Sequence, residues 1–328
     1  MGGSEDAVDP VIDLANLICR YRRTEAVAGV TFTVEAGTVF ALLGPNGAGK
    51  TTIIRTLMNI IQPSAGAARV LGVDTRRLGP RELATIGYVS ENQQLPGWMT
   101  LAELLAYCRP FYPGWDDALC SKLVSDFELP LRMKIGRMSR GMRVKAALVS
   151  ALAYRPSLLV LDEPFSGLDP VVRDDLIHGV LERAGEERWS VLVSSHDLDE
   201  VERLVDAVAF LDGGRLVLCE PMAMLQERFR RVEVTMTETG APFERSGSTD
   251  AVPTPEAWIG MTVAGRVVRF TDTAYEGGSS ESRLSARFPG ARIEVQPMSL
   301  RQIFVALVRH RRGSQETSRP DSVREVAR

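Results

Sequence analysis

The sequence predicts an α/β protein whose main domain is built on a mostly parallel sheet, with a small α+β appendage behind it. Uninterrupted apolar runs at residues 39–43 and 158–161 are typical of parallel strands that are covered on both faces. The first run passes through a glycine-rich loop into residues 53–58, whose apolar spacing favours a helix. The composition changes after Phe229, where shorter strand-like segments and polar loops begin.

The bulk composition excludes several classes of protein. The 328 residues, 45% of them hydrophobic, are enough to bury a core and to divide into two units. Four scattered cysteines without a C-x-x-C pair indicate reduced thiols of the cytosol rather than a disulfide framework or a zinc site. The first residues lack the pattern of a signal peptide, and no apolar run is long enough to span a bilayer. A net charge of −3 gives no general attraction to nucleic acid, so we expect no nucleic-acid partner.

We expect the main domain at residues 11–229, preceded by a flexible N-terminal tail at residues 1–10. Short runs before about Gly37 predict a small antiparallel sheet, and helical spacing predicts a helical subdomain at about residues 92–155. The remaining predicted strands of this domain are residues 68–72, 86–93 (running into a loop), 191–194, 207–211 and 215–218.

The appendage is predicted at residues 230–311 as an accessory α+β domain. An apolar face between Leu300 and Val308 predicts its final helix, and polar residues 312–328 predict a disordered tail. Strand-like segments and turn-rich loops precede that helix; the strands are predicted at residues 231–236, 266–271 and 292–295, and the loops at residues 240–255 and 276–282.

The segment GPNGAGKTT, residues 44–52, fills the pattern G-x-x-x-x-G-K-[ST] between a buried strand and a helix. Glycines let backbone N–H groups close on phosphate oxygens, and the helix N-terminus adds a favourable potential. Lys50 can reach the terminal phosphates, and Thr51 can offer its hydroxyl to Mg²⁺. The pattern therefore predicts a nucleotide site formed by Gly44, Pro45, Asn46, Gly47, Ala48, Gly49, Lys50, Thr51 and Thr52.

Polar residues follow the other two apolar strands. Asp162 and Glu163 end the run that begins at residue 158, and His196 ends the run that begins at residue 191. Because parallel sheets place their sites at the carboxyl ends of the strands, these side chains are expected near the glycine-rich loop. The structural alternatives are a helix cap for Asp162, a solvated charge for Glu163 and a packed lone histidine.

With these motifs in this order, the chain resembles the ATP-binding subunit of an ABC transporter over about residues 11–218. Residues 44–52 are similar to the Walker A loop of that family and residues 158–163 to Walker B. Residues 139–142 resemble its signature, residues 166–169 its D-loop, and His196 its switch histidine. The resemblance implies the ABC-type cassette of the P-loop NTPases, with a helical signature subdomain.

The resemblance also implies a role for each site residue. Asp162 would hold Mg²⁺ together with Thr51, because a hard cation prefers carboxylate and hydroxyl oxygens. Glu163 would act as the general base on the attacking water, and His196 would contact the γ-phosphate. Two further residues complete the ATP site in the family pattern: Tyr21 would stack on adenine, and Asp169 belongs to the D-loop.

Two positions depart from the family pattern. Glu91 stands where the family usually has Gln; its carboxylate could approach Mg²⁺, although Gln93 and Gln94 leave an alternative register open. Within the signature, Arg140 either points away from the phosphate or adds its own charge to that site.

The resemblance implies two kinds of protein partner. Ser139 and Gly141 would complete the site of a second ATPase subunit, in a homodimer or a heterodimer that encloses two ATP molecules. The helical subdomain would bind a separate permease, which places a cytoplasmic protein on the inner face of the cell membrane. Similarity is strongest to ATPases of ABC-2-type permeases. The aromatic residues of this region are expected to be mostly packing, with one or two in the permease groove: Trp98, Tyr107, Phe111, Tyr112 and Trp115.

Two other functions compete with transport. Superfamily members that act on chromosomes carry long coiled-coil insertions, and those that act on ribosomes carry two cassettes; this sequence shows neither feature. A nucleotide-gated regulator with little turnover stays open, because Glu91 and Arg140 are unusual.

Overall fold

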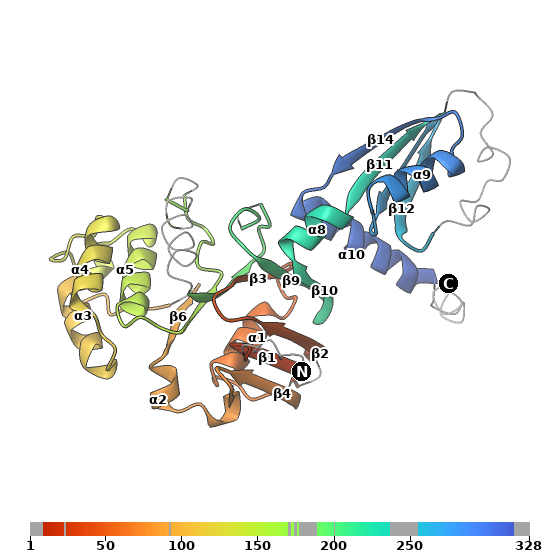
Figure 1. Cartoon of the computed structure of the whole chain (residues 1–328). Helices are drawn as coiled ribbons and strands as arrows, with labels where there is room; N and C mark the ends of the chain where they lie inside the picture. Colours follow the sequence, from red (N-terminus) through yellow and green to blue (C-terminus); the bar gives the residue numbers. More distant parts are fainter. Residues whose placement is uncertain are drawn as a thin grey trace, which may run out of the picture. The chain divides into compact units, whose positions relative to one another are not determined.

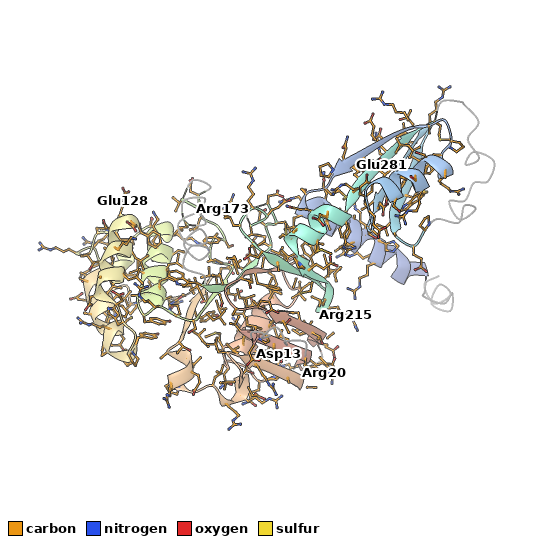
Figure 2. The ribbon with its side chains drawn as sticks, in the orientation of Figure 1. Asp13, Arg20, Glu128, Arg173, Arg215 and Glu281 are labelled. Atoms are coloured by element: carbon orange, nitrogen blue, oxygen red, sulfur yellow. The ribbon has the colours of Figure 1, made fainter. Side chains whose placement is uncertain are left out.

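The computed structural model describes residues 9–22, 24–91, 93–169, 172–173, 176, 189–199, 201–236 and 255–317 (Figure 1). The chain consists of two compact units, Met1–Cys219 and Glu220–Arg328, and each is described by itself. Most of the expected N-terminal tail and residues 318–328 lie outside the described part. Charged side chains labelled in Figure 2, such as Arg20, Glu128 and Glu281, are exposed.

A six-stranded sheet forms the centre of the first unit. Its strand order is β10-β9-β3-β8-β7-β6, and the pairs of β3 with β8 and β9 and of β7 with β6 and β8 are parallel. Every residue of β3, β7 and β8 is buried, as the apolar runs predicted. The strands are β3 (Val39–Leu43), β6 (Ile86–Ser90), β7 (Leu158–Asp162), β8 (Ser190–Ser195), β9 (Ala207–Asp212) and β10 (Arg215–Pro221).

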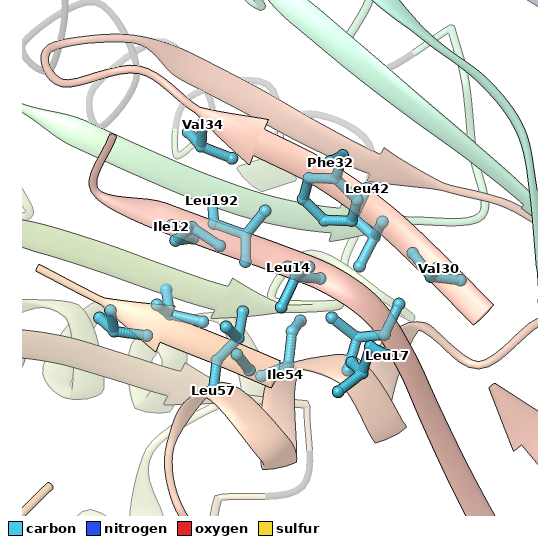
Figure 3. Packing of buried hydrophobic residues seen from close by; sticks show 14 of the residues in the cluster. Ile12, Leu14, Leu17, Val30, Phe32, Val34, Leu42, Ile54, Leu57 and Leu192 are labelled. Carbon is cyan, nitrogen blue, oxygen red and sulfur yellow. The ribbon is translucent and has the colours of Figure 1, made fainter. Parts of the chain in front are cut away.

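The predicted antiparallel sheet has the order β2-β1-β4-β5. It consists of β1 (Ile12–Tyr21), β2 (Thr24–Val34), β4 (Ala65–Val70) and β5 (Val73–Asp74). Apolar side chains of β1 such as Leu14 pack in one core cluster with Ile54 and Leu57 of helix α1 (Lys50–Leu57) and with Leu192 of β8 (Figure 3). This shared core fixes α1, and with it the glycine-rich loop, against both sheets.

The helical subdomain lies between β6 and β7. Two of its helices begin at a capping side chain. Thr100 forms a capping box with Glu103 at the helix that starts at Leu101, and the hydroxyl of Ser139 accepts from Met142 N at 3.2 Å at the helix that starts at Arg140. None of the described helices is long and apolar enough to cross a membrane. The helices are α2 (Pro80–Leu83, before β6), α3 (Leu101–Cys108), α4 (Asp117–Asp126) and α5 (Arg140–Leu152), with 3-10 turns at Thr75–Arg77, Arg109–Phe111 and Ile135–Arg137.

The expectation that most aromatic residues of this subdomain pack in its core is wrong. Trp98, Tyr107 and Phe111 are 71%, 56% and 61% exposed, and Tyr112 and Trp115 are half-buried. The core of the subdomain is built from aliphatic residues instead, such as Leu101, Leu104 and Leu123 of α3 and α4. The rings of Tyr107 and Phe111 are in contact, with centroids 5.4 Å apart, and we call the three exposed side chains together the aromatic face: Trp98, Tyr107 and Phe111.

The second unit is an α+β structure, as predicted. Its four-stranded sheet has the order β12-β13-β11-β14, with every neighbouring pair antiparallel. Its elements are α8 (Met222–Arg228), β11 (Arg230–Thr235), β12 (Trp258–Ala264), β13 (Val267–Asp272), α9 (Gly278–Arg287), β14 (Arg292–Pro297) and α10 (Leu300–Thr317).

Two predictions for this unit are wrong. The loop expected at residues 276–282 contains the start of α9. The Gly-Gly-Ser-Ser run at residues 277–280 is typical of a loop, but Leu284 and Phe288, four residues apart, are buried in the core and stabilise a helix there. The disorder expected from residue 312 is wrong up to residue 317, since α10 continues to Thr317 and Arg311 and Arg312 favour a helix. The expected loop at residues 240–255 lies almost entirely outside the described part.

Helix α8 belongs to the second unit, although the sequence pattern placed the boundary after it, at Phe229. Arg228, at the end of α8, pairs with Glu220 at 2.5 Å and donates to the carbonyl oxygen of Thr273. These contacts tie α8 to the strands that follow it.

Candidate functional site

The glycine-rich loop connects β3 to α1. Two of its glycines lie so close to the backbone of neighbouring segments that a side chain would not fit. Gly44 and Gly49 have φ angles of 152° and 103°. A Cβ on Gly44 would lie 2.3 Å from the carbonyl oxygen of Leu211, and one on Gly49 would lie 2.5 Å from that of Ala26. Glycine is therefore required at both positions for space as well as for conformation.

Lys50 is the first residue of α1 and is 5% exposed. Its Nζ donates to the carbonyl oxygen of Gly44 at 2.7 Å and to that of Pro45 at 3.3 Å. The same ammonium forms an ion pair with Glu163 Oε1 at 3.1 Å, and that oxygen accepts no hydrogen bond within the described residues. One cation thus joins the loop to the carboxyl end of β7.

Asp162 is the last residue of β7 and lies beside the start of α1. Its Oδ1 accepts from Thr51 Oγ1 at 3.1 Å and from Ser194 Oγ at 2.8 Å. Burial raises the pKa of this carboxyl, the two hydroxyl hydrogen bonds lower it, and the charge of Glu163 raises it; the net direction is upward. A carboxylate and a hydroxyl in contact match the oxygen ligands that Mg²⁺ prefers, so Thr51 and Asp162 fit a magnesium site.

Glu163 lies between two basic side chains. Its Oε1 faces Lys50, and its Oε2 lies 2.7 Å from His196 Nδ1. The backbone N–H of Glu163 donates to Ser194 Oγ at 2.9 Å. Its φ of 49° is in the left-handed region, which is uncommon for a glutamate and costs on the order of 1 kcal/mol. The surroundings hold this carboxylate in one orientation at the edge of the sheet.

Replacing Asp162 with asparagine is expected to stabilise the nucleotide-free protein at pH 7. The folded Asp162 has a pKa above its ordinary 3.8, so the unfolded chain loses its proton first and stability falls as the pH rises between the two values. The asparagine side chain carries no charge to desolvate, and each kcal/mol gained raises Tm by about 2–4 °C. In thermal melts in EDTA, the Tm of Asp162→Asn should exceed that of the wild type at pH 7, and the difference should shrink toward pH 4.

The exposed Asp117 provides the control for this change. Asp117→Asn should leave the pH dependence of Tm unchanged, because Asp117 is 60% exposed and a solvated carboxylate has little desolvation to relieve. A lower Tm for Asp162→Asn at pH 7 would contradict the raised pKa.

Three other predicted site residues are not brought to this cluster by described contacts. Tyr21 is 45% exposed at the end of β1. Glu91 is exposed just after β6 and makes no hydrogen bond or ion pair with a described residue, whereas Gln93 Oε1 accepts from Ser90 N at 3.3 Å. Asp169 accepts through its carbonyl oxygen from Arg173 N at 2.9 Å. The roles expected for these residues stay predictions.

The signature residues lie at the start of α5 and contact the segment that follows β7. Gly141 lies against Val172, whose Cγ1 would be 2.7 Å from a Cβ on that glycine. The guanidinium of Arg140 lies against Gly167, with Nη1 2.8 Å from the corresponding Cβ position. The charge of Arg140 therefore lies at the D-loop segment of its own chain, and the two alternatives for its effect on a bound phosphate stay predictions.

Ser194 is a site residue that the sequence motifs did not identify. Its hydroxyl bonds both to the carboxylate of Asp162 and to the backbone N–H of Glu163. A signal for it exists, because Ser194 is directly opposite Asp162 in the register of β7 and β8. Aligning the last residues of the predicted strands, Leu161 and Ser194, would have placed it within one residue of Asp162.

Comparisons with known proteins agree with this geometry. A family model described as "ABC transporter" matches residues 27–166, and one described as "AAA domain, putative AbiEii toxin, Type IV TA system" matches residues 131–202. The chain is 30% identical to the ABC transporter ATP-binding protein YtrB of Bacillus subtilis, over 68% of this chain and 76% of that protein.

A second relative matches over more of the chain. The Nod factor export ATP-binding protein I of Neorhizobium galegae is 32% identical over 93% of this chain and 86% of that protein. A solved structure described as the ATP-binding subunit of an ABC transporter is 30% identical, with a TM-score of 0.59 over 66% of this chain and 92% of that chain. The chain belongs to the family of ABC transporter ATP-binding proteins.

Proposed function

We propose that this ABC ATPase dimerises around two Mg-ATP molecules and drives a conformational change in a separate membrane permease. The observation that carries the proposal is the position of Glu163, whose carboxylate lies between Lys50 and His196 beside the Thr51–Asp162 pair. Phosphoryl transfer to water needs a cation at the phosphates, oxygen ligands for Mg²⁺ and a base for the water. The cluster supplies a candidate for each.

Each residue has one proposed task. The loop from Gly44 to Thr52 binds the phosphates, with Lys50 at the terminal ones. Thr51 and Asp162 hold Mg²⁺, which when bound neutralises charge that develops on the phosphate oxygens. Glu163 orients the attacking water and takes its proton, and His196 fixes the Glu163 carboxylate and reaches the γ-phosphate. Three residues complete our proposal with less structural support: Tyr21 on adenine, Glu91 near the metal and Asp169 in the D-loop.

The second half of each site is proposed to come from another subunit, identical or not. Ser139 and Gly141 stand at the N-terminus of α5, where a hydroxyl and a backbone N–H suit a phosphate oxygen. No described contact joins them to the loop of their own chain. Placing them on a second chain gives that loop a partner for the γ-phosphate.

We further propose that the helical subdomain binds the permease, which would keep the ATPase on the inner face of the cell membrane. A cavity of about 380 Å³ in the same unit is lined by Leu104, Cys108 and Tyr112, which neighbour Tyr107 and Phe111 along the chain. Exposed aromatic side chains near such a cavity suit an amphipathic helix. Because two relatives are ATP-binding proteins and one of them is named for Nod factor export, an exporter with an ABC-2-type permease is our preferred assembly.

Replacing Trp98 and Phe111 together with alanine is expected to weaken permease binding by at least tenfold. These two exposed rings would be buried at the interface, and buried aromatic side chains dominate interface energies at about 2 kcal/mol or more each. The measurement is co-purification of the co-expressed permease, encoded by the neighbouring reading frame if that frame predicts a membrane protein.

The control for this double change is Met224→Ala. Met224 is 51% exposed on α8, so its loss should change neither co-purification nor ATPase activity. If the permease is retained by the Trp98 and Phe111 variant as well as by the control, the aromatic face is an ordinary surface.

A low-turnover regulator is the second candidate function, favoured by the exposed Glu91 and by Arg140. Steady-state ATP hydrolysis by the purified chain separates the two. A transport ATPase should turn over with Mg²⁺ on the order of 1 s⁻¹ or faster and stop in EDTA. Binding of ATP without sustained release of phosphate would favour the regulator.

A further inference from the structure

The second unit contains a cavity of about 410 Å³ between its sheet and α10. Alternation along the strands explains its position. Val232, Val268 and Phe270 pack on one face of the sheet with Leu284 of α9, so the alternate side chains of β11 and β13 point to the opposite face. Helix α10 covers part of that opposite face, and the cavity lies between them.

The charged side chains that line this cavity are all positive among the described residues. Four arginines line it, and none of the described lining residues is Asp or Glu. Two of the arginines, Arg231 and Arg309, form no ion pair with a described carboxylate. Another, Arg269, is paired with Glu233 at 2.7 Å, and this bond lowers the pKa of Glu233. The arginines are Arg231, Arg269, Arg301 and Arg309.

A threonine also lines this cavity. Thr271 is 8% exposed, lines the cavity, and its side chain makes no hydrogen bond with any described residue. It is directly opposite Arg231 in the register of β11 and β13. Its hydroxyl can donate to an acceptor that is bound beside Arg231.

The rest of the lining is apolar. Met298, Val305 and Ala306 contribute carbon surface, and Gly260 leaves open space where a side chain would stand. Guanidinium groups donate two parallel hydrogen bonds to phosphate or carboxylate oxygens, whereas carbon surface favours an organic group. The two kinds of lining together select a molecule that has both parts.

We propose that this cavity binds a small organic oxyanion, with its phosphate or carboxylate on Arg231, Arg309 and Thr271 and its apolar part against Val305 and Met298. The proposal does not depend on the ATP site, because every residue in it belongs to the second unit. It gives the accessory unit a ligand of its own.

Isothermal titration of the full chain with phenyl phosphate tests the proposal, with the glycine-rich loop kept saturated by Mg-ADP. We expect one binding site per chain. Arg231→Gln should weaken binding about tenfold, since a charge-assisted hydrogen bond contributes about 1.5–3 kcal/mol. Thr271→Val should weaken it about threefold or more, and Val305→Trp should abolish it by filling the cavity. Benzoate in place of phenyl phosphate distinguishes a carboxylate site from a phosphate site.

Two controls make the titration decisive. Arg287→Gln removes an exposed arginine from α9, on the other side of the sheet, and should leave binding unchanged. Val305 is 38% exposed, so Val305→Trp should fold, which a thermal melt verifies. The proposal is overturned if neither probe binds up to about 10 mM, or if Val305→Trp and Arg287→Gln bind equally well.

Discussion

Replacing Glu163 with glutamine is expected to lower the steady-state ATPase rate by about 100- to 1,000-fold, the usual contribution of a general base. Glutamine keeps the size and one oxygen of the side chain, so Lys50 and His196 retain a neighbour. It cannot take a proton from water. ATP should therefore bind and remain intact, and light scattering should show a stable dimer in Mg-ATP. Phosphate release and scattering measured on the same sample separate binding from chemistry.

Glu294→Gln is the matched control for the Glu163 change. Glu294 is an exposed glutamate of β14, paired only with Arg292, and its replacement should change neither the rate nor the dimer. Near wild-type turnover by Glu163→Gln would show that Glu163 is not the general base and that another group takes the proton from water.

Replacing Lys50 with alanine is expected to weaken ATP binding by about 100-fold or more, because two charge-assisted contacts are lost at about 1.5–3 kcal/mol each. The change should also destabilise the free protein by about 1–3 kcal/mol, since Glu163 Oε1 stays buried without its partner while Oε2 keeps His196. Titration with a fluorescent ATP analogue measures the first effect, and thermal melts measure the second.

A double variant separates these two effects. Adding Glu163→Gln to Lys50→Ala removes the uncompensated charge and should restore stability without restoring ATP binding. Lys122→Ala, at an exposed lysine of α4, should affect neither quantity. Recovery of both quantities in the double variant would show that Lys50 acts on the fold alone.

The sequence predicted best those elements in which every residue is buried. The core strands β3, β7 and β8 are buried throughout and mainly apolar, because both faces are covered. Strand β12 was missed, since Gly260 and the register shift before Thr262 interrupt its alternation. The aromatic face was expected to be mainly core because composition alone does not show which side of a helix contacts solvent.

The candidate site was predictable where one segment carries a complete motif. Residues 44–52 contain the whole phosphate loop, and the order of the later motifs indicated the family. Contacts between distant segments were not predictable in the same way. Ser194 joins Asp162 to Glu163 across two strands, and Arg140 lies against Gly167 through packing of α5 on a loop. Such contacts depend on tertiary register: aligning the predicted strand ends brings Ser194 only near Asp162, and local pattern does not specify the packing of Arg140.

The central claim is that each ATP site is completed by Ser139 and Gly141 of a second chain, and mixing two inactive variants tests it most directly. Lys50→Ala destroys the loop but keeps the signature, whereas Ser139→Arg blocks the signature but keeps the loop. In a mixed dimer one site regains both halves, so an equal mixture should recover up to about a quarter of the wild-type ATPase rate. A mixture no more active than the sum of the two variants alone would contradict a site shared between chains.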